Sequence, residues 1–321
     1  MKKWILFMMC TVLAVALVGC AKKETLTQDA NQNDKKIKIV VTNYPLYDFV
    51  RAIVGDYADL TMLIKPGTEN HSYEPSPEDI IKIQNSDVFI YIGGENDQWV
   101  ETIMKSMPTT DKKVIKMIDH VNTILEETVE GMAPEEQENE SVAEEAESDE
   151  HIWTSPKNAI RMITTINKVL CELDLKNADD FNTNTLAYTS QLELVDKDIK
   201  GIVDRAQTKI LVFGDRFPFR YFVDEFGLEY RAAFNGCSTE TEASVGTLAY
   251  LIDFVKKNKI PYVYHIELSN ENIAKSICEQ TGANMLQLHS CHNVTKDDFE
   301  AGVTYLSLMQ QNAETLRKGL Q

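Results

Sequence analysis

Histidines carry the clearest potential for chemistry in this sequence, because imidazole is a common ligand of transition metals. The six are His71, His120, His151, His265, His289 and His292. His71 follows a predicted strand, His289 ends another, and His151 stands directly ahead of a predicted helix. In open parallel sheets, ligands bind beyond the carboxyl ends of the strands. This spacing predicts that histidines from two parts of the chain converge on one metal site, although spacing alone also fits dispersed surface histidines.

Short β-branched segments alternate with segments of helical spacing, a pattern typical of parallel sheets covered by helices. The strands are expected at 37–42, 60–64, 88–92, 209–213, 229–234, 262–266 and 284–288. Residues 178–206 contain no proline and a single late glycine, which predicts a rigid helix about 40 Å long. The end of the chain, 297–320, is expected to form one closing helix.

The sequence therefore predicts an α/β protein of two lobes with mainly parallel sheets, joined by one long rigid helix, with a metal site in the cleft between the lobes. The N-terminal lobe is expected over 37–177, the connecting helix over 178–206 and the C-terminal lobe over 207–321. Within the first lobe, 126–150 contains twelve acidic and no basic residues. Like charges and few large apolar side chains predict a mobile acidic loop there.

Composition excludes several classes of protein. The chain has 321 residues, of which 43% are hydrophobic and 26% are charged, so a disordered chain is excluded. The formal net charge of −18 argues against nucleic acid as a partner.

The first residues predict export. Lys2 and Lys3 precede an apolar run over 4–18, too short for a spanning helix and typical of a signal peptide. The run ends in Leu17-Val18-Gly19-Cys20, which resembles the lipobox of bacterial lipoproteins. The resemblance implies a signal peptide over 1–20, a lipid on Cys20 that anchors the mature protein to the membrane, and a polar linker over 21–36.

Two further segments carry a family resemblance. Residues 66–77 read PGTENHSYEPSP and residues 151–159 read HIWTSPKNA. They resemble the metal-binding loops of the substrate-binding proteins of zinc and manganese ABC importers, and the order of the predicted elements agrees from about residue 37 to residue 320. The resemblance implies that His71 and His151 are metal ligands. It also implies a monomer that works with a permease and its ATPase.

The second lobe departs from the family pattern. Where many relatives have His-Asp after the first strand of this lobe, the chain has Gly214-Asp215. Where relatives end the last strand with an aspartate ligand, it has Leu288-His289. We therefore expect His289 to be the third ligand. Asp215, Glu267, His292 and water stay open as candidates for a fourth.

We expect a binding protein and no enzyme. Three imidazoles favour Zn²⁺ as the transported ligand over Mn²⁺, which suits carboxylate-rich sites. A manganese importer component and a surface adhesin are the alternatives. A secreted zinc hydrolase is less favoured, because the sequence has no HExxH motif. Four cysteines permit three disulfide connectivities in an exported chain. They are Cys171, Cys237, Cys278 and Cys291.

Overall fold

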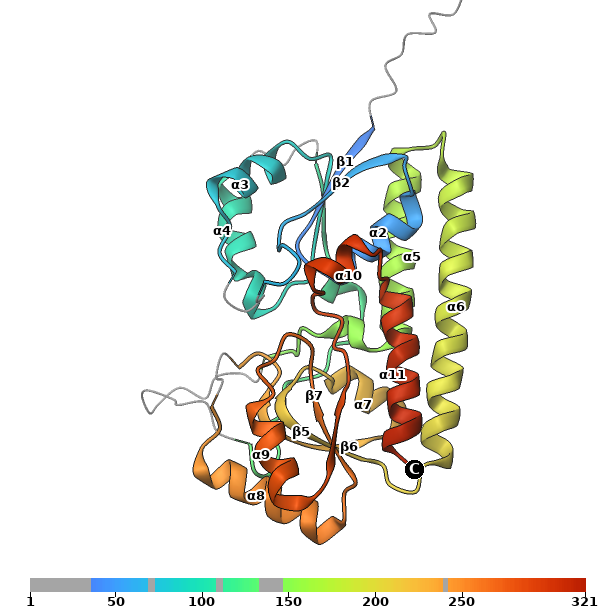
Figure 1. The fold of residues 1–321 in the computed structure, drawn as a ribbon. Helices are drawn as coiled ribbons and strands as arrows, with labels where there is room; N and C mark the ends of the chain where they lie inside the picture. Colours follow the sequence, from blue (N-terminus) through green and yellow to red (C-terminus); the bar gives the residue numbers. More distant parts are fainter. Residues whose placement is uncertain (1–35, 69–72, 108–111, 133–146, 239–241) are drawn as a thin grey trace, which may run out of the picture. The chain divides into compact units, whose positions relative to one another are not determined.

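The computed structural model describes residues 36–68, 73–107, 112–132, 147–238 and 242–321. They contain two four-stranded sheets in which every strand pair is parallel (Figure 1). Their orders are β2-β1-β3-β4 and β6-β5-β7-β8. The strands are β1 (Ile37–Val41), β2 (Ala58–Met62), β3 (Val88–Tyr91), β4 (Lys113–Lys116), β5 (Ile210–Phe217), β6 (Glu229–Asn235), β7 (Tyr262–His265) and β8 (Asn284–Gln287). The predicted class, two α/β lobes with parallel sheets, is confirmed.

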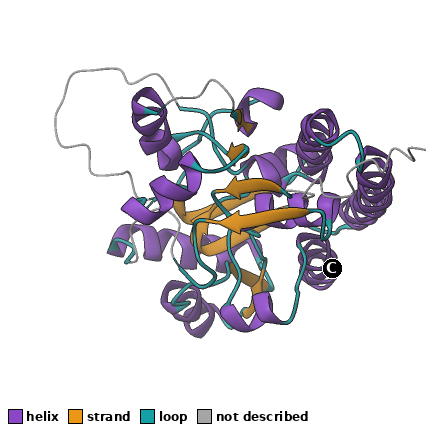
Figure 2. Ribbon diagram, turned by 90° about the horizontal axis from the view of Figure 1, so that it is seen from above, coloured by secondary structure: helices purple, strands orange, loops and turns teal. Residues whose placement is uncertain are grey.

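Helices supply the crossovers that parallel neighbours require, and they surround the strands in Figure 2. They are α2 (Tyr44–Val54), α3 (Pro77–Gln84), α4 (Gln98–Ser106), α5 (Pro156–Leu173), α7 (Arg220–Phe226), α8 (Val245–Asn258) and α9 (Asn272–Thr281). The predicted long helix is α6 (Ala178–Arg205), which contacts α2 and α5 as well as α7. It runs along both lobes in Figure 1.

Strand β3 shows how the sequence builds the layers. Its side chains alternate between the two faces of the first sheet, as the two-residue period of a strand requires. Val88 and Ile90 belong to the core that faces α2 and α5. Phe89 and Tyr91 belong to a second core with Val100 of α4. A four-residue apolar run is therefore buried on both faces.

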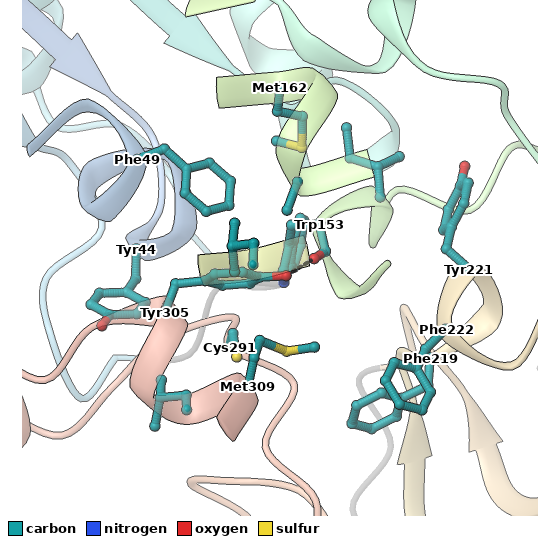
Figure 3. Packing of buried hydrophobic residues seen from close by; sticks show 14 of the residues in the cluster. Tyr44, Phe49, Trp153, Met162, Phe219, Tyr221, Phe222, Cys291, Tyr305 and Met309 are labelled. Carbon is teal, nitrogen blue, oxygen red and sulfur yellow. Dashed lines mark hydrogen bonds between the residues drawn. The ribbon is translucent and has the colours of Figure 1, made fainter. Parts of the chain in front are cut away.

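The core that faces the long helix is continuous across both lobes. Tyr305, from the end of the chain, lies in it with its ring centroid 4.9 Å from that of Phe49 (Figure 3). The Tyr305 hydroxyl donates a hydrogen bond to the backbone oxygen of Trp153 at 2.6 Å. The two lobes are thus packed on shared side chains as well as on α6.

The closing segment is two helices, so the prediction of a single helix over 297–320 is wrong. They are α10 (Lys296–Glu300) and α11 (Tyr305–Gly319). Gly302 has a φ of 74°, a left-handed conformation that ends the first helix. Thr304 then caps the second, accepting a hydrogen bond from the amide of Ser307 at 3.0 Å.

This closing segment returns to the first lobe. The ring of Phe299 lies 5.1 Å from that of Tyr47 on α2. The Tyr44 hydroxyl donates to the backbone oxygen of Val303 at 2.9 Å. Residues 207–321 therefore pack partly on the first lobe, and the predicted lobe boundaries stay predictions.

Both ends of the acidic segment 126–150 are built into the fold. Leu125 and Ser148 form an antiparallel bridge, and Met132 is buried in the shared core. The centre of the predicted mobile loop, 133–146, lies outside the described residues, as do the predicted signal peptide and Cys20. Among the described helices, none is both long and apolar enough to cross a membrane.

Candidate metal centre

His151 is fixed by its own loop. It directly precedes the 3-10 turn η3 (Ile152–Thr154), and its ring is fully buried. Its Nδ1 lies 3.2 Å from a carboxylate oxygen of Asp149. A carboxylate accepts only, so in the neutral ring Nδ1 carries the proton and Nε2 carries the lone pair. The backbone oxygen of Asp149 is in turn held by the Tyr221 hydroxyl at 2.6 Å. This is the arrangement by which proteins orient a histidine ligand toward a metal.

Burial and the nearby carboxylates shift the pKa of His151 in opposite directions. Burial lowers the pKa of the imidazole, but the carboxylates of Asp149, Glu150 and Glu126 outweigh it, so the net pKa is raised. The environment of this ring therefore favours a positive charge at its position.

His292 is the second histidine at this point. Its ring lies edge-on to that of His151, with centroids 5.4 Å apart, and 4.9 Å from Trp153. The indole nitrogen of Trp153 donates to the backbone oxygen of Ser290 at 2.9 Å and so holds the segment before His292. His292 lines two small cavities, one beside Glu150 and the other beside the second-lobe loops. The structure therefore brings His151 and His292 together.

His289 is placed differently. Its Nδ1 accepts a hydrogen bond from the amide of Cys291 at 2.9 Å, so in the neutral ring the proton is on Nε2. Its backbone groups pair with the side-chain amide of Asn312 at 2.7 and 2.8 Å. Through these hydrogen bonds, His289 stabilises the loop after β8. Its predicted role as a ligand stays a prediction.

Two other predicted candidates are hydrogen-bonded to backbone amides. An oxygen of Asp215 accepts from Ile266 at 3.2 Å. Glu267 accepts from Ser290 at 2.7 Å and from His292 at 3.1 Å. Both carboxylates therefore position loops beside the candidate site.

The structure leaves no room for a side chain at Gly214, where the resemblance led us to look for a histidine. A Cβ atom at this position would lie 2.4 Å from the Cα of Ala274 on α9. That separation is far inside van der Waals contact, so no side chain fits. The helix α9 occupies the space that a histidine would need.

Two residues at the site escaped the sequence analysis, namely Glu150 and Cys237. A carboxylate oxygen of Glu150, a ring nitrogen of His151 and the Cys237 sulfur all lie within 4.8 Å of one another. We call these three residues the acid–thiol cluster. Cys237 follows β6 by two residues, so its place beyond the carboxyl end of a strand was the available signal. All four cysteines among the described residues are free thiols.

In the acid–thiol cluster, the negatively charged forms of Glu150 and Cys237 are unfavourable. Burial raises the pKa of Glu150 to about 7, with His151 and Asn96 acting against the shift. Burial, together with Glu150 and Glu126, raises the pKa of the Cys237 thiol well above its usual range. Bringing these groups together as anions costs free energy that a bound cation would offset.

His71 itself lies outside the described residues. The residues just before it are held against the second lobe. Gly67 donates its amide to the backbone oxygen of Val294 at 2.7 Å. Asn293 donates to the backbone oxygens of Lys65 and Thr68, both at 2.9 Å. The start of the predicted first metal loop is thus tied to the residues that follow His292.

Comparison with known proteins identifies the family of the chain. Residues 39–319 match the family described as ZnuA, zinc-uptake complex component A, periplasmic. The chain belongs to the ZnuA family. Family members form part of a metal-uptake transporter.

Two relatives and one solved structure are similar to this chain. It is 32% identical to the zinc-binding lipoprotein AdcA of Streptococcus pneumoniae, over 99% of this chain and 61% of AdcA. It is 26% identical to the high-affinity zinc uptake system protein ZnuA of Bacillus subtilis, over 99% and 98% of the two chains. The Zn(II)-bound ZnuA-like domain of the pneumococcal AdcA superposes with a TM-score of 0.72 at 30% identity, over 89% of this chain and 99% of the domain. The chain thus spans about three fifths of the length of AdcA.

Proposed function

We propose that this chain captures Zn²⁺ outside the membrane and delivers it to an ABC importer, through the permease and its ATPase, without catalysing a reaction. The observation that carries the proposal is the buried ring of His151, whose Nδ1 is held by Asp149 so that Nε2 can bind a metal. Membership of the ZnuA family and relatives named as zinc-binding support it.

Donor chemistry favours zinc over manganese. Imidazole and thiolate are donors that suit Zn²⁺, while Mn²⁺ prefers carboxylate and water oxygens. His151, His292 and Cys237 supply nitrogen and sulfur in one region of the molecule. A manganese importer component and a surface adhesin remain alternatives, and the sequence disfavours a hydrolase.

The ligands are part of the proposal. His71 and His151 are proposed from the family loops, with His289 from its place after β8. Asp215, Glu267 and His292 remain further candidates. The ring contact between His151 and His292 supports His292 over His289, while both carboxylates are engaged by backbone amides.

The location is proposed from the first residues. A lipid on Cys20 would tether a monomer to the extracytoplasmic face of the cell membrane. The name zinc-binding lipoprotein, carried by the pneumococcal relative, supports this tether.

Elemental analysis of the purified protein, followed by competition titration with a chelator, tests the function. We expect zinc to be recovered with the protein and to bind at least about 100-fold more tightly than manganese. A protein that binds neither metal would refute the proposal. If the protein binds manganese more tightly than zinc, the transported ion is manganese, as in the alternative function.

A further inference from the structure

The acid–thiol cluster joins the two lobes. Glu150 and His151 belong to the first-lobe segment before η3, whereas Cys237 follows β6 of the second sheet. Their potential ligand atoms lie within 4.8 Å of one another. In a tetrahedral zinc site, ligand bonds of ~2.0–2.3 Å place the donors roughly 3.5 Å apart. A contraction of about 1 Å would therefore bring the three donors to bonding distance of one ion.

Each of the two first-lobe donors is already held. Asn96 donates its backbone amide to a Glu150 oxygen at 3.2 Å, and its side-chain amide binds the other oxygen. Gly94 makes room for this carboxylate, because a Cβ there would lie 2.7 Å from it. His151 is held by Asp149. The donors are thus oriented before any ion binds.

Gly236 allows the second-lobe donor, Cys237, to lie close to His151. A Cβ at Gly236 would lie 2.9 Å from the His151 ring, so only glycine lets the chain pass this close just before Cys237. The Cys237 amide donates to a Glu126 oxygen at 3.3 Å, which fixes the backbone at the thiol. The thiol is partly buried and is free of any disulfide.

We propose that Cys237 is a zinc ligand, binding as the thiolate together with His151 and Glu150. The inference rests on the proposed function, whose site it completes from the second lobe. Cys237 supplies the second-lobe donor that Gly214 cannot. Zinc binding would release the thiol proton to solvent, because the thiolate is the ligand. A positive ion would also compensate the neighbouring carboxylates.

Cobalt substitution tests the sulfur bond directly. Co²⁺ bound to a thiolate gives an intense charge-transfer absorption in the near ultraviolet, which nitrogen and oxygen ligands do not give. We expect this band in the wild-type protein loaded with Co²⁺ and its loss in Cys237→Ser. Cys278→Ser, on α9 outside the cluster, is the matched control and should keep the band. A band that persists in Cys237→Ser would overturn the proposal.

Zinc protection gives a second readout that needs no variant. Alkylation by N-ethylmaleimide at alkaline pH, followed by mass spectrometry, should label Cys237 slowly without zinc, because its pKa is raised, and at least about tenfold more slowly again with zinc. Labelling of Cys278 should not change. If the wild-type protein binds zinc but Cys237 is labelled equally in both states, the cysteine assignment fails and the proposed function stands. If the wild-type protein binds no zinc, the proposed function fails as well.

Discussion

At the residue scale, the two histidines of the loop after β8 differ in what their rings contact. His292 faces His151, whereas His289 accepts the amide of Cys291. We expect His292→Ala to weaken zinc binding by about 100-fold or more and His289→Ala by less than about tenfold. Competition with a fluorescent zinc chelator measures both. If His289→Ala weakens zinc binding more than His292→Ala does, His289 is the ligand, as predicted from the sequence.

Gly214 is a second residue with a specific consequence. Because its Cβ position overlaps the backbone of α9, Gly214→Ala should lower the free energy of unfolding by about 1–3 kcal/mol. Gly246→Ala, whose added Cβ would lie at an ordinary 3.6 Å from Ser244, is the matched control and should leave stability equal or up to about 1 kcal/mol higher. Urea denaturation measures both. A fully stable Gly214→Ala would show that α9 can move far enough to admit a Cβ atom.

Glu225 on α7 links stability to pH. Its carboxylate accepts a hydrogen bond from Ser155, and burial together with Asp196 raises its pKa to about 7. An acid whose pKa is raised by folding is ionised at a cost in the folded state. The free energy of unfolding of the zinc-free protein should therefore fall as pH rises from about 5 to about 8.

The substitution Glu225→Gln isolates this effect. It should flatten the pH dependence and make the protein more stable than the wild type near pH 8, as measured by urea denaturation across this range. Glu172→Gln, at an exposed position of α5, should keep the wild-type slope. Equal slopes in all three proteins would exclude Glu225 as the source.

At the element scale, the two ends of the acidic segment 126–150 pack on the rest of the protein, and 133–146 lies between them. Replacing 133–146 with a short Gly-Ser linker keeps Met132, the Leu125–Ser148 bridge and Glu150. We therefore expect little change in melting temperature or in zinc affinity, measured by calorimetry and chelator competition. A large loss of affinity would place zinc ligands within 133–146.

Elements were predictable from the sequence where local pattern decides them. The β-branched runs gave the strands, and the uninterrupted helical spacing of 178–206 gave α6. The break between α10 and α11 was missed, because its cause combines a left-handed Gly302 with the Thr304 cap. The placement of Cys237 beside His151 depends on how two distant loops meet, and no local pattern encodes that.

At the scale of the whole molecule, the proposed lipid decides where the protein resides. Cys20→Ala should release the mature protein from the membrane fraction into the medium or periplasm, because the acyl anchor is lost. Cys10→Ala, within the predicted signal segment, is the matched control and should remain in the membrane fraction. Fractionation and immunoblotting measure both. Retention of Cys20→Ala on membranes would contradict the anchor.

The return of the closing helices to the first lobe bears on when the chain can fold. Tyr305 is fully buried between the lobes, and its amide donates to Asp48 of α2 at 2.8 Å. A nascent chain still lacking its last residues would leave that part of the first core open to water. The N-terminal lobe therefore cannot reach its final packing ahead of the C-terminus. If the chain is exported as proposed, part of the first-lobe core stays unformed in the precursor until residue 305 has been synthesised.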